Sequence, residues 1–152
     1  MKLATLCYLK KDNKTLMLHR IKKDKDIHAG KWNGLGGKFD EHETPEECAI
    51  REIEEESGLV AKELNLKGMI TFPKFKDNED WYVFVYVVPK FSGTLRECEE
   101  GELHWIANES LNDLNLWEGD RIFFPWLEQN SFFSAKFIYE NGNYIKHEVS
   151  FY

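Results

Sequence analysis

Short apolar runs alternate along the chain with short polar segments, which is the pattern of strands joined by turns. Lys11-Asp12-Asn13-Lys14 has the composition of a turn, and Asn141-Gly142-Asn143 predicts a hairpin. The runs on either side of these turns, and those between them, are predicted strands: residues 3–9, 15–20, 67–72, 81–88, 102–106, 134–140 and 144–151.

One helix has clear start and stop signals. Thr44 is a predicted N-cap, Pro45 occupies the first helical position and Glu47 the third, so the segment forms a capping box. Gly58 is a typical residue just past a helix end. These signals predict a helix over residues 45–57. A second helix over 120–129, interrupted at Pro125, completes an α+β domain with a mixed sheet.

The first helix has an apolar face and an acidic face side by side. At about 100° per residue, Ala49, Ile50 and Ile53 share one arc and are predicted to be buried. The adjoining arc is acidic, and the remaining arc is predicted to face solvent. The acidic arc holds Glu52, Glu55 and Glu56, and the solvent arc holds Glu47, Arg51 and Glu54.

The acidic arc is poorly arranged for helix stability. Glu52 repels Glu55 and Glu56 at helical spacing, and all three lie where the helix dipole disfavours anions. A solvated acidic face is the ordinary explanation. The alternative is a site for a hard divalent cation such as Mg²⁺, which prefers oxygen ligands and is usually shared with substrate phosphates.

Acidic residues concentrate in one part of the chain. The net charge is −7, but residues 40–56 contain nine acids and one strong base, Arg51. That segment carries −8 and the remaining residues together +1. Non-specific binding of a nucleic-acid polymer needs Lys and Arg to neutralise phosphates, so this pattern argues against such a partner.

Length and cysteine content limit the class of protein further. The 152 residues suffice for one domain, and no segment approaches the roughly 20 apolar residues of a membrane helix. Three cysteines show neither a disulfide framework nor a zinc-binding spacing, which favours a reducing compartment. We therefore expect a cytoplasmic protein that does not bind membranes.

One motif is specific to a family. Gly37, five residues, Glu43, seven residues and then Arg51-Glu52-Ile53-Glu54-Glu55-Glu56-Ser57-Gly58-Leu59 match the Nudix box. The chain resembles the Nudix hydrolases, which cleave a nucleoside diphosphate linked to a further group. The resemblance implies one Nudix domain over residues 1–152, with the box at 37–59. It also implies a mixed sheet between helices, with the box as loop, helix and loop.

Three further segments narrow the resemblance. Residues 32–38 (Trp-Asn-Gly-Leu-Gly-Gly-Lys), 117–120 (Trp-Glu-Gly-Asp) and 133–137 (Phe-Ser-Ala-Lys-Phe) are similar to MutT/MutX-like 8-oxo-dGTP diphosphatases. This chain has Gly119-Asp120 where mammalian members have two consecutive aspartates. The resemblance implies a Mg²⁺-dependent nucleoside triphosphate pyrophosphohydrolase, with Mn²⁺ as a substitute metal. Its expected reaction converts 8-oxo-dGTP to 8-oxo-dGMP and pyrophosphate, which sanitises the nucleotide pool.

Metal-site roles follow from the box. By resemblance, Glu52, Glu55 and Glu56 ligate Mg²⁺ together with the main-chain carbonyl of Gly36. Glycine suits that position, because a backbone oxygen must approach the metal without a Cβ in the way. Glu100 resembles the loop carboxylate that relatives bring to the metal or to the nucleophilic water.

The general base and the support of the box are assigned separately. The candidates for the general base are Glu52, Glu56 and Glu100, and their spacing does not choose among them. Arg51 is expected to be structural, holding the box loop through Glu43.

Substrate contacts are expected on both sides of the box. Trp117 is the predicted stacking surface for a purine, and Asn33 and Asp120 are predicted to read its edge. Asp120 accepts from purine donors, or donates if an apolar pocket keeps it protonated. The other predicted contacts are phosphate-binding Lys23 and Lys38, the segment Leu35-Gly36-Gly37, and pocket walls from Tyr8 and Phe72. Most other C-terminal aromatic residues, including Phe124, Phe137 and Tyr139, are predicted core.

Two rival functions remain from the sequence. Another Nudix substrate, such as ADP-ribose or a dinucleoside polyphosphate, would use the same box. A non-catalytic nucleotide-sensing domain would keep the fold, but could dispense with the glutamates that are all present here. The expected partner is a small nucleoside triphosphate, bound by a monomer or weak dimer.

Overall fold

The computed structural model of the chain describes residues 1–22 and 27–152. Its strands are β1 (Lys2–Lys11), β2 (Lys14–His19), β3 (Trp32–Asn33), β4 (Val60–Lys76), β5 (Glu79–Ser92), β6 (Glu102–Ala107), β7 (Phe133–Glu140) and β8 (Asn143–Phe151). Its helices are α1 (Pro45–Ser57) and α2 (Glu118–Phe123), with 3₁₀ helices η1 (Asn108–Asp113) and η2 (Phe124–Glu128).

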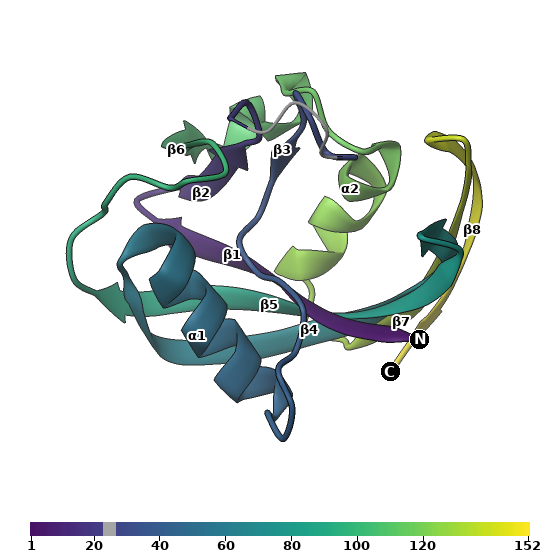
Figure 1. Cartoon of the computed structure of the whole chain (residues 1–152), viewed down its shortest axis with the longest axis horizontal. Helices are drawn as coiled ribbons and strands as arrows, with labels where there is room; N and C mark the ends of the chain where they lie inside the picture. The colour runs from purple at the N-terminus through teal and green to yellow at the C-terminus, as the bar shows by residue number, and fades with distance from the viewer. Residues whose placement is uncertain (23–26) are drawn as a thin grey trace.

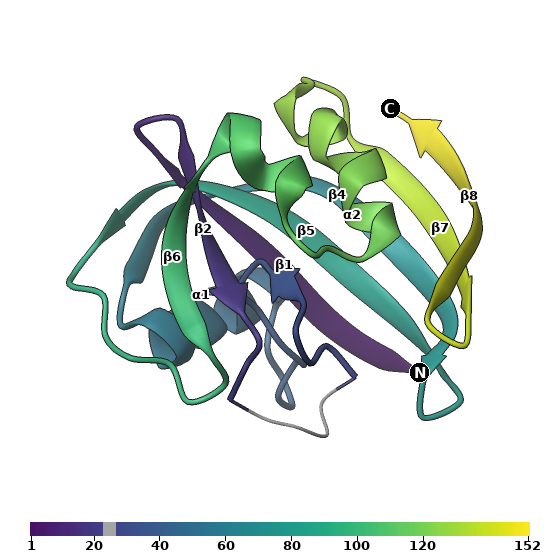
Figure 2. The same cartoon turned by 90° about the horizontal axis from the view of Figure 1, so that it is seen from above.

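The strands form one mixed sheet. Their order is β3-β2-β1-β5-β4-β7-β8, and β6 pairs with β2 beside this path (Figure 2). β1 runs parallel to β5 and β4 parallel to β7, whereas the other neighbouring pairs are antiparallel. The long strands β4 and β5 therefore lie between β1 and β7, and β1 connects them to the smaller β2, β3 and β6 group.

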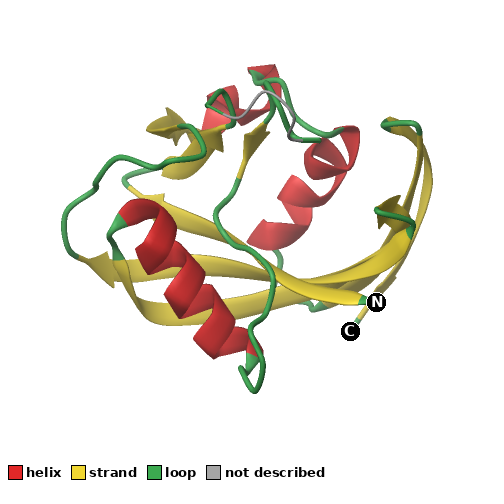
Figure 3. Cartoon of the chain, in the orientation of Figure 1, coloured by secondary structure: helices red, strands yellow, loops and turns green. Residues whose placement is uncertain are grey.

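Helices cover both faces of the sheet. α1 lies on one face, and α2 lies on the other (Figures 1 and 3). Alternate residues of β1 divide between the two cores, because successive side chains of a strand point to opposite faces. Cys7 and Leu9 join the cluster that contains Ile53, whereas Tyr8 joins the cluster that contains Phe123. None of the helices in the described ranges is long and apolar enough to cross a membrane.

The signals that predicted α1 are present in its structure. Thr44 Oγ1 accepts from the Glu47 amide at 3.1 Å, and the Thr44 amide donates to Glu47 Oε1 at 3.0 Å. Gly58 ends the helix in the left-handed conformation, with φ at 80°, and its amide donates to the Glu54 carbonyl. The predicted bounds of 45–57 are confirmed.

The buried face of α1 is rotated from the predicted one. Ile50, predicted to be buried, is 36% exposed, whereas Glu56 is only 8% exposed. The buried arc is centred on Ala49 and extends toward the acidic side, so Ile50 falls at its edge. The full buried set is Cys48, Ala49, Ile53, Glu56 and Ser57. The buried face of α1 therefore includes one carboxylate, that of Glu56.

β4 is much longer than the strand predicted over 67–72. It has 17 residues, and β-bulges between Ala61 and Glu63 and between Glu63 and Asn65 interrupt its pairing with β5. A bulge shifts the alternation of inward and outward residues by one. The N-terminal half of β4 therefore lacks the period-two pattern by which strands are recognised.

The helix predicted over 120–129 is two short helices. α2 begins at Glu118 and passes at Phe124 into η2. Pro125 lies in the first turn of η2, where a missing amide hydrogen is tolerated. The predicted interruption is present, whereas η1 was not predicted. α2 places Trp117 at its N-cap and Asp120 in its first turn.

Replacement of the N-cap tests how firmly α1 is held. We expect Thr44→Ala to lower the free energy of unfolding by about 1 kcal/mol, because the Glu47 amide loses its acceptor. Urea denaturation followed by circular dichroism measures the change. Thr44→Ser keeps the accepting oxygen and serves as the control. Equal stability of the alanine and serine variants would contradict the role of the capping box.

Candidate active site

A cavity of about 460 Å³ lies beside the box. One end is polar and is lined by Gly36, Glu52 and Glu100. The other end is largely aromatic and is lined by Trp117 together with Asp120. Ligand cavities commonly combine apolar walls with a few polar groups that fix orientation, and this cavity has both within one space.

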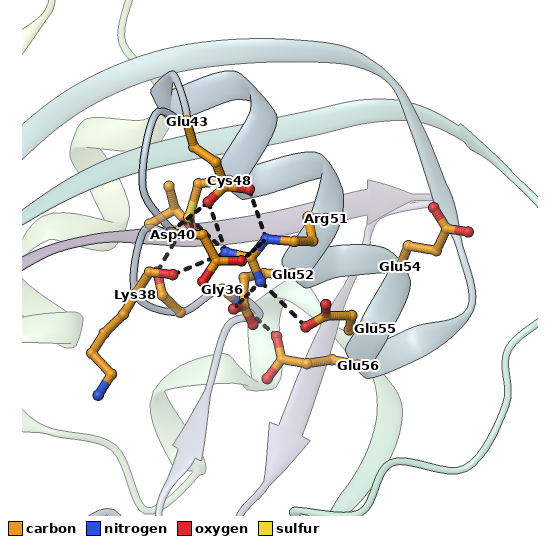
Figure 4. Close-up of polar contacts among 12 residues, drawn as sticks. Gly36, Lys38, Asp40, Glu43, Cys48, Arg51, Glu52, Glu54, Glu55 and Glu56 are labelled. Carbon is orange, nitrogen blue, oxygen red and sulfur yellow. Dashed lines mark hydrogen bonds and ion pairs between the residues drawn. The ribbon is translucent and has the colours of Figure 1, made fainter.

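Arg51 joins the loop of the box to its helix (Figure 4). Its Nε and Nη2 atoms donate to the two carboxylate oxygens of Glu43, at 2.7 and 2.9 Å, and Nη2 also donates to the Lys38 carbonyl at 3.0 Å. Nη1 donates to Glu52 at 2.7 Å and to Glu55 at 3.3 Å. The prediction that Arg51 faces solvent away from these glutamates is wrong, because its long side chain folds back between the loop and the acidic arc.

Glu43 is held as a carboxylate by its hydrogen bonds. The Arg51 guanidinium, and then the Asp40 amide, lower the pKa of Glu43 to about 2. Because charge-assisted bidentate bonds are directional as well as strong, this pair fixes the loop against α1.

Glu56 is the buried carboxylate of the acidic arc. Its Oε1 accepts from the Gly36 amide at 2.7 Å. Burial raises the pKa of Glu56 well above the usual value, and the charges of Glu100 and Glu52 raise it further. The bond from Gly36 acts in the opposite direction. The pKa of Glu52 is also raised, mainly by burial.

The glycine segment can approach this arc because it has no Cβ atoms. Gly36 has a φ of +136°, and a Cβ there would lie 2.1 Å from the Thr5 carbonyl oxygen. A Cβ on Gly37 would lie 2.6 Å from the Glu52 carboxylate. Hydrogen bonds from the Thr5 amide to the Gly37 carbonyl and between Cys7 and Leu35 attach the segment to β1. The backbone around Gly36 is thus held against the carboxylates of α1.

Arg20 is a site residue that the sequence analysis missed. Its Nη1 lies 3.3 Å from Glu100 Oε2, and both side chains line the polar end of the cavity. Arg20 also lowers the pKa of Glu56 through its charge. The available signal was its place at the end of β2, directly before the loop that leads to the box.

The donor set fits a hard cation in its chemistry. Among the residues that the structure describes, no three His, Cys, Asp or Glu side chains are already grouped to hold an ion. Each candidate carboxylate of the acidic arc, and Glu100, instead contacts an arginine or a backbone amide. Carboxylate oxygens are the ligands that Mg²⁺ prefers, and the mutual repulsion that raises the pKa of Glu56 would be relieved by a cation.

The aromatic end is built from three chain segments. Trp117 makes edge contacts with Phe75 at 5.1 Å and with Tyr139 at 5.4 Å between ring centroids. Phe72 lies 5.2 Å from Phe75, and all four rings line the cavity. Tyr139 was predicted to be core although it follows the segment 133–137 closely, and Phe75 was not singled out because it is far in sequence from every recognised motif. Asn33 also lines this cavity.

Residues 119 and 120 are glycine and aspartate here, where mammalian members have two aspartates, and the surroundings of both residues bear on this difference. Asp120 is 8% exposed, and burial raises its pKa to about 7, against the opposing charges of Arg121 and Lys31. A Cβ on Gly119 would lie 2.6 Å from the hydroxyl oxygen of Tyr139, which accepts from the Gly119 amide at 2.7 Å. The Tyr139 hydroxyl therefore occupies the space that a second aspartate would need.

The structure does not bring every predicted residue to the cavity. Leu35, Gly36, Gly37, Lys38 and Phe72 line it, whereas Glu55 and Glu56 are not among its lining residues. Tyr8, predicted as a wall, is 1% exposed and packs in the core against Phe123 and Phe124, behind Gly34. Its hydroxyl has no hydrogen-bond partner in the described part of the chain. Lys23 lies outside the described residues.

Comparisons with known proteins identify relatives. A family model for the NUDIX domain matches residues 2–127. The oxidized purine nucleoside triphosphate hydrolase of Mus musculus is 35% identical over 123 residues, which covers 81% of this chain and 79% of the relative. The protein of the same name from Danio rerio is 32% identical over the same shares of each chain.

Solved structures show the same fold. The MutT protein from Bacillus halodurans superposes with a TM-score of 0.87 at 22% identity, over 99% of this chain and 98% of that one. A MutT Nudix hydrolase from Burkholderia pseudomallei has a TM-score of 0.70 at 30% identity, over 85% and 97%. The predicted α+β fold with a mixed sheet is confirmed.

The family match and the relatives agree with the box. Nudix hydrolases generally use divalent cations such as Mg²⁺. The matched model covers more than half of the chain, and the mouse relative exceeds 30% identity over most of both chains. This chain therefore belongs to the Nudix family of hydrolases, which act on nucleotide phosphoanhydride bonds.

Proposed function

We propose that the chain is a divalent-cation-dependent pyrophosphohydrolase of oxidised purine nucleoside triphosphates, with 8-oxo-dGTP as the favoured substrate. The observation that carries this proposal is that one cavity is lined both by acidic and cationic groups and by aromatic rings. A triphosphate suits the first set of groups and a purine the second. The names of the mouse and zebrafish relatives support the same substrate class.

The metal would be held at the polar end. The ligands we propose are Glu52, Glu55, Glu56 and the Gly36 carbonyl, with Glu100 completing the set. Mg²⁺ bound there, or Mn²⁺ in its place, would supply neutralisation of phosphate charge and a more acidic water. Glu55 is the most exposed of the carboxylates, with a side chain 60% exposed, so it is the ligand most shared with solvent.

The chain's own residues supply the remaining chemistry. Glu52, Glu56 and Glu100 are the candidates for accepting the proton of the attacking water. The raised pKa of Glu56 lets it hold that proton after transfer. Arg20 and Lys38 line the polar end and would contact phosphate oxygens. The products would be a nucleoside monophosphate and pyrophosphate, with water attacking the β-phosphorus.

Base recognition would combine stacking with paired polar groups. The ring of Trp117 would stack on the purine, which contributes about 1–3 kcal/mol whatever the base. An 8-oxo purine differs from its parent by a carbonyl and an N–H, so selectivity requires groups such as Asn33 and Asp120. With a pKa of about 7, Asp120 is available both as a donor and as an acceptor near neutral pH.

The wider proposal concerns the setting of the enzyme. Residues 1–152 would form one domain, because β7 and β8 complete the sheet beyond the matched residues 2–127. The enzyme would act in the cytoplasm on free nucleotides, as a monomer or weak dimer, and would sanitise the nucleotide pool.

A nucleotide panel tests the function. With Mg²⁺ present, we expect kcat/KM to be highest for 8-oxo-dGTP, with pyrophosphate rather than orthophosphate as product. In labelled water the label should enter pyrophosphate, and label in the monophosphate would contradict attack at the β-phosphorus. Higher kcat/KM for ADP-ribose or a dinucleoside polyphosphate would favour that substrate instead. Absence of turnover with every nucleotide would favour a sensing domain.

Glu56→Gln tests the metal face. We expect kcat to fall by about a hundredfold or more, because the variant keeps the shape of the side chain and removes its charge. The circular dichroism spectrum should be unchanged. Glu54→Gln, on the exposed face of the same helix, is the matched control and should keep wild-type turnover (Figure 4). Turnover of Glu56→Gln within about threefold of wild type would contradict the assignment.

Asn33→Ala and Trp117→Ala distinguish hydrogen bonding to the edge of the base from stacking on its ring. The asparagine variant should raise KM for 8-oxo-dGTP more than for dGTP, because it removes a hydrogen-bonding group from the base pocket. The tryptophan variant should raise KM for both nucleotides by similar factors, since stacking does not depend on base identity. Steady-state kinetics with the two nucleotides measure both effects. Unchanged preference and KM in both variants would place the base elsewhere.

Asp120→Asn tests the buried carboxylate through stability. Burial raises the pKa of Asp120 from its ordinary value of 3.8 to about 7 in the folded chain, so its ionisation destabilises the fold as pH rises between these values. The variant should be more stable than wild type at pH 8, by roughly 4 kcal/mol at most, and should gain nothing below pH 4. Urea titrations measure this, with exposed Asp113→Asn as control. If Asp120→Asn and the wild-type protein had the same free energy of unfolding at pH 8 as well as below pH 4, the raised pKa would be contradicted.

A further inference from the structure

The indole of Trp117 is held by a hydrogen bond to a histidine. Trp117 Nε1 donates to His28 Nδ1 at 2.7 Å, and the two rings meet edge to face at an interplanar angle of 81°. His28 lines the same cavity as Trp117. No motif of the sequence singled it out, because it lies in the loop before the box.

The backbone holds His28 in place for this bond. The His28 carbonyl accepts from the Lys31 amide at 2.8 Å, which closes a turn. The Gly30 amide donates to the Arg20 carbonyl at 2.7 Å, and Asn115 Nδ2 donates to the Gly30 carbonyl at 2.9 Å. The turn is therefore attached both to the end of β2 and to the segment just before Trp117.

The other contacts of Trp117 fix its orientation less tightly. Its neighbours Phe75 and Tyr139 contact it through ring edges, and the Lys31 ammonium lies 5.1 Å from its ring centroid. Such contacts tolerate small rotations of the indole, whereas a hydrogen bond prefers a nearly linear geometry. The bond to His28 thus sets the plane on which a purine would stack.

This bond depends on the protonation state of the imidazole. An indole N–H can only donate, so Nδ1 of His28 must be unprotonated to accept from it. An added proton turns both imidazole nitrogens into donors and removes the acceptor. The described charged or titratable groups on the elements packed against this pair are Lys31 at the turn, Arg20 after β2, Lys76 in β4 beside Phe75, Asp120 in α2, and Tyr139 in β7.

We propose that His28 is a positioning residue that orients Trp117 for purine stacking, and that its protonation weakens nucleotide binding without altering the hydrolytic step. The consequence for nucleotides rests on the proposed function, whereas the coupling between His28 and Trp117 does not. Purine affinity then falls as the medium becomes acidic, while the carboxylates proposed to act on phosphate belong to α1 and to the loop before β6, not to the elements that carry His28 and Trp117.

Nuclear magnetic resonance of the indole N–H groups tests the coupling without any substrate. The chain has five tryptophans, and loss of one signal in Trp117→Phe assigns the relevant resonance. Between about pH 8 and about pH 5, where a histidine changes charge, this resonance should move upfield in the wild-type protein. His28→Asn places an amide oxygen near the position of Nδ1 and should keep the signal downfield throughout. His28→Leu should give the upfield position at every pH.

Kinetics then test the consequence for binding. KM for 8-oxo-dGTP should rise about fivefold across the same pH range in the wild-type protein, relative to His28→Asn measured beside it. His28→Leu should show the raised KM at high pH already, with kcat within about twofold of wild type. His42→Asn is the matched control, because that histidine has a side chain 95% exposed in the loop before α1, and it should keep the wild-type pH profile.

The outcomes separate the two proposals. If the chemical shift of the Trp117 indole N–H does not change with pH, or is the same in His28→Leu as in wild type, the positioning role is overturned. A coupled resonance with a KM ratio that does not change with pH also overturns the effect on binding. If the resonance behaves as expected but no purine triphosphate is hydrolysed, the proposed function fails and the coupling stands.

Discussion

The salt bridge between Arg51 and Glu43 aligns the two halves of the box. The guanidinium contacts the loop through Glu43 and the Lys38 carbonyl, and the helix through Glu52. The glycine segment itself is attached by the bond from the Gly36 amide to Glu56 and by its hydrogen bonds to β1, and the salt bridge fixes the loop that follows it against α1. The depressed pKa of Glu43, about 2, means that its contribution to stability is complete above its ordinary value of 4.5 and is lost as pH falls through about 2.

One carboxylate of the acidic arc, Glu56, is buried at a cost in free energy. Arg51 contacts Glu52 and Arg20 contacts Glu100, whereas Glu56 is buried and accepts a hydrogen bond from the Gly36 amide. Burying a carboxylate costs free energy that the other contacts of the fold must offset. Functional sites commonly contain such locally unfavourable groups. The aromatic end shows the same feature in Asp120.

Features that short stretches of sequence determine, such as the ends of α1 and the Nudix box, were predicted correctly. The cap at Thr44 and the stop at Gly58 gave the bounds of α1, and the box spacing gave the family. The orientation of Ile50 and Arg51 was predicted wrongly, because the sheet decides which side of a helix is buried. Arg20, His28, Phe75 and Tyr139 escaped because tertiary contacts bring them together from distant segments. Tyr8 was predicted to line the cavity but lies in the core, because one apolar residue in a strand does not show how deeply its side chain is buried.

The fit between Gly119 and Tyr139 links two positions that are twenty residues apart. The Tyr139 hydroxyl fills the volume a side chain at 119 would need, and it accepts the amide hydrogen of that residue. A carboxylate at 119 would therefore require Tyr139 to move or be replaced, and Phe137, whose Cδ1 lies 2.9 Å from the same Cβ position, to shift as well. Substitutions in direct contact are not additive, so each residue sets which mutations the other tolerates. This epistasis limits the order in which a lineage with this pocket could acquire a second acidic group.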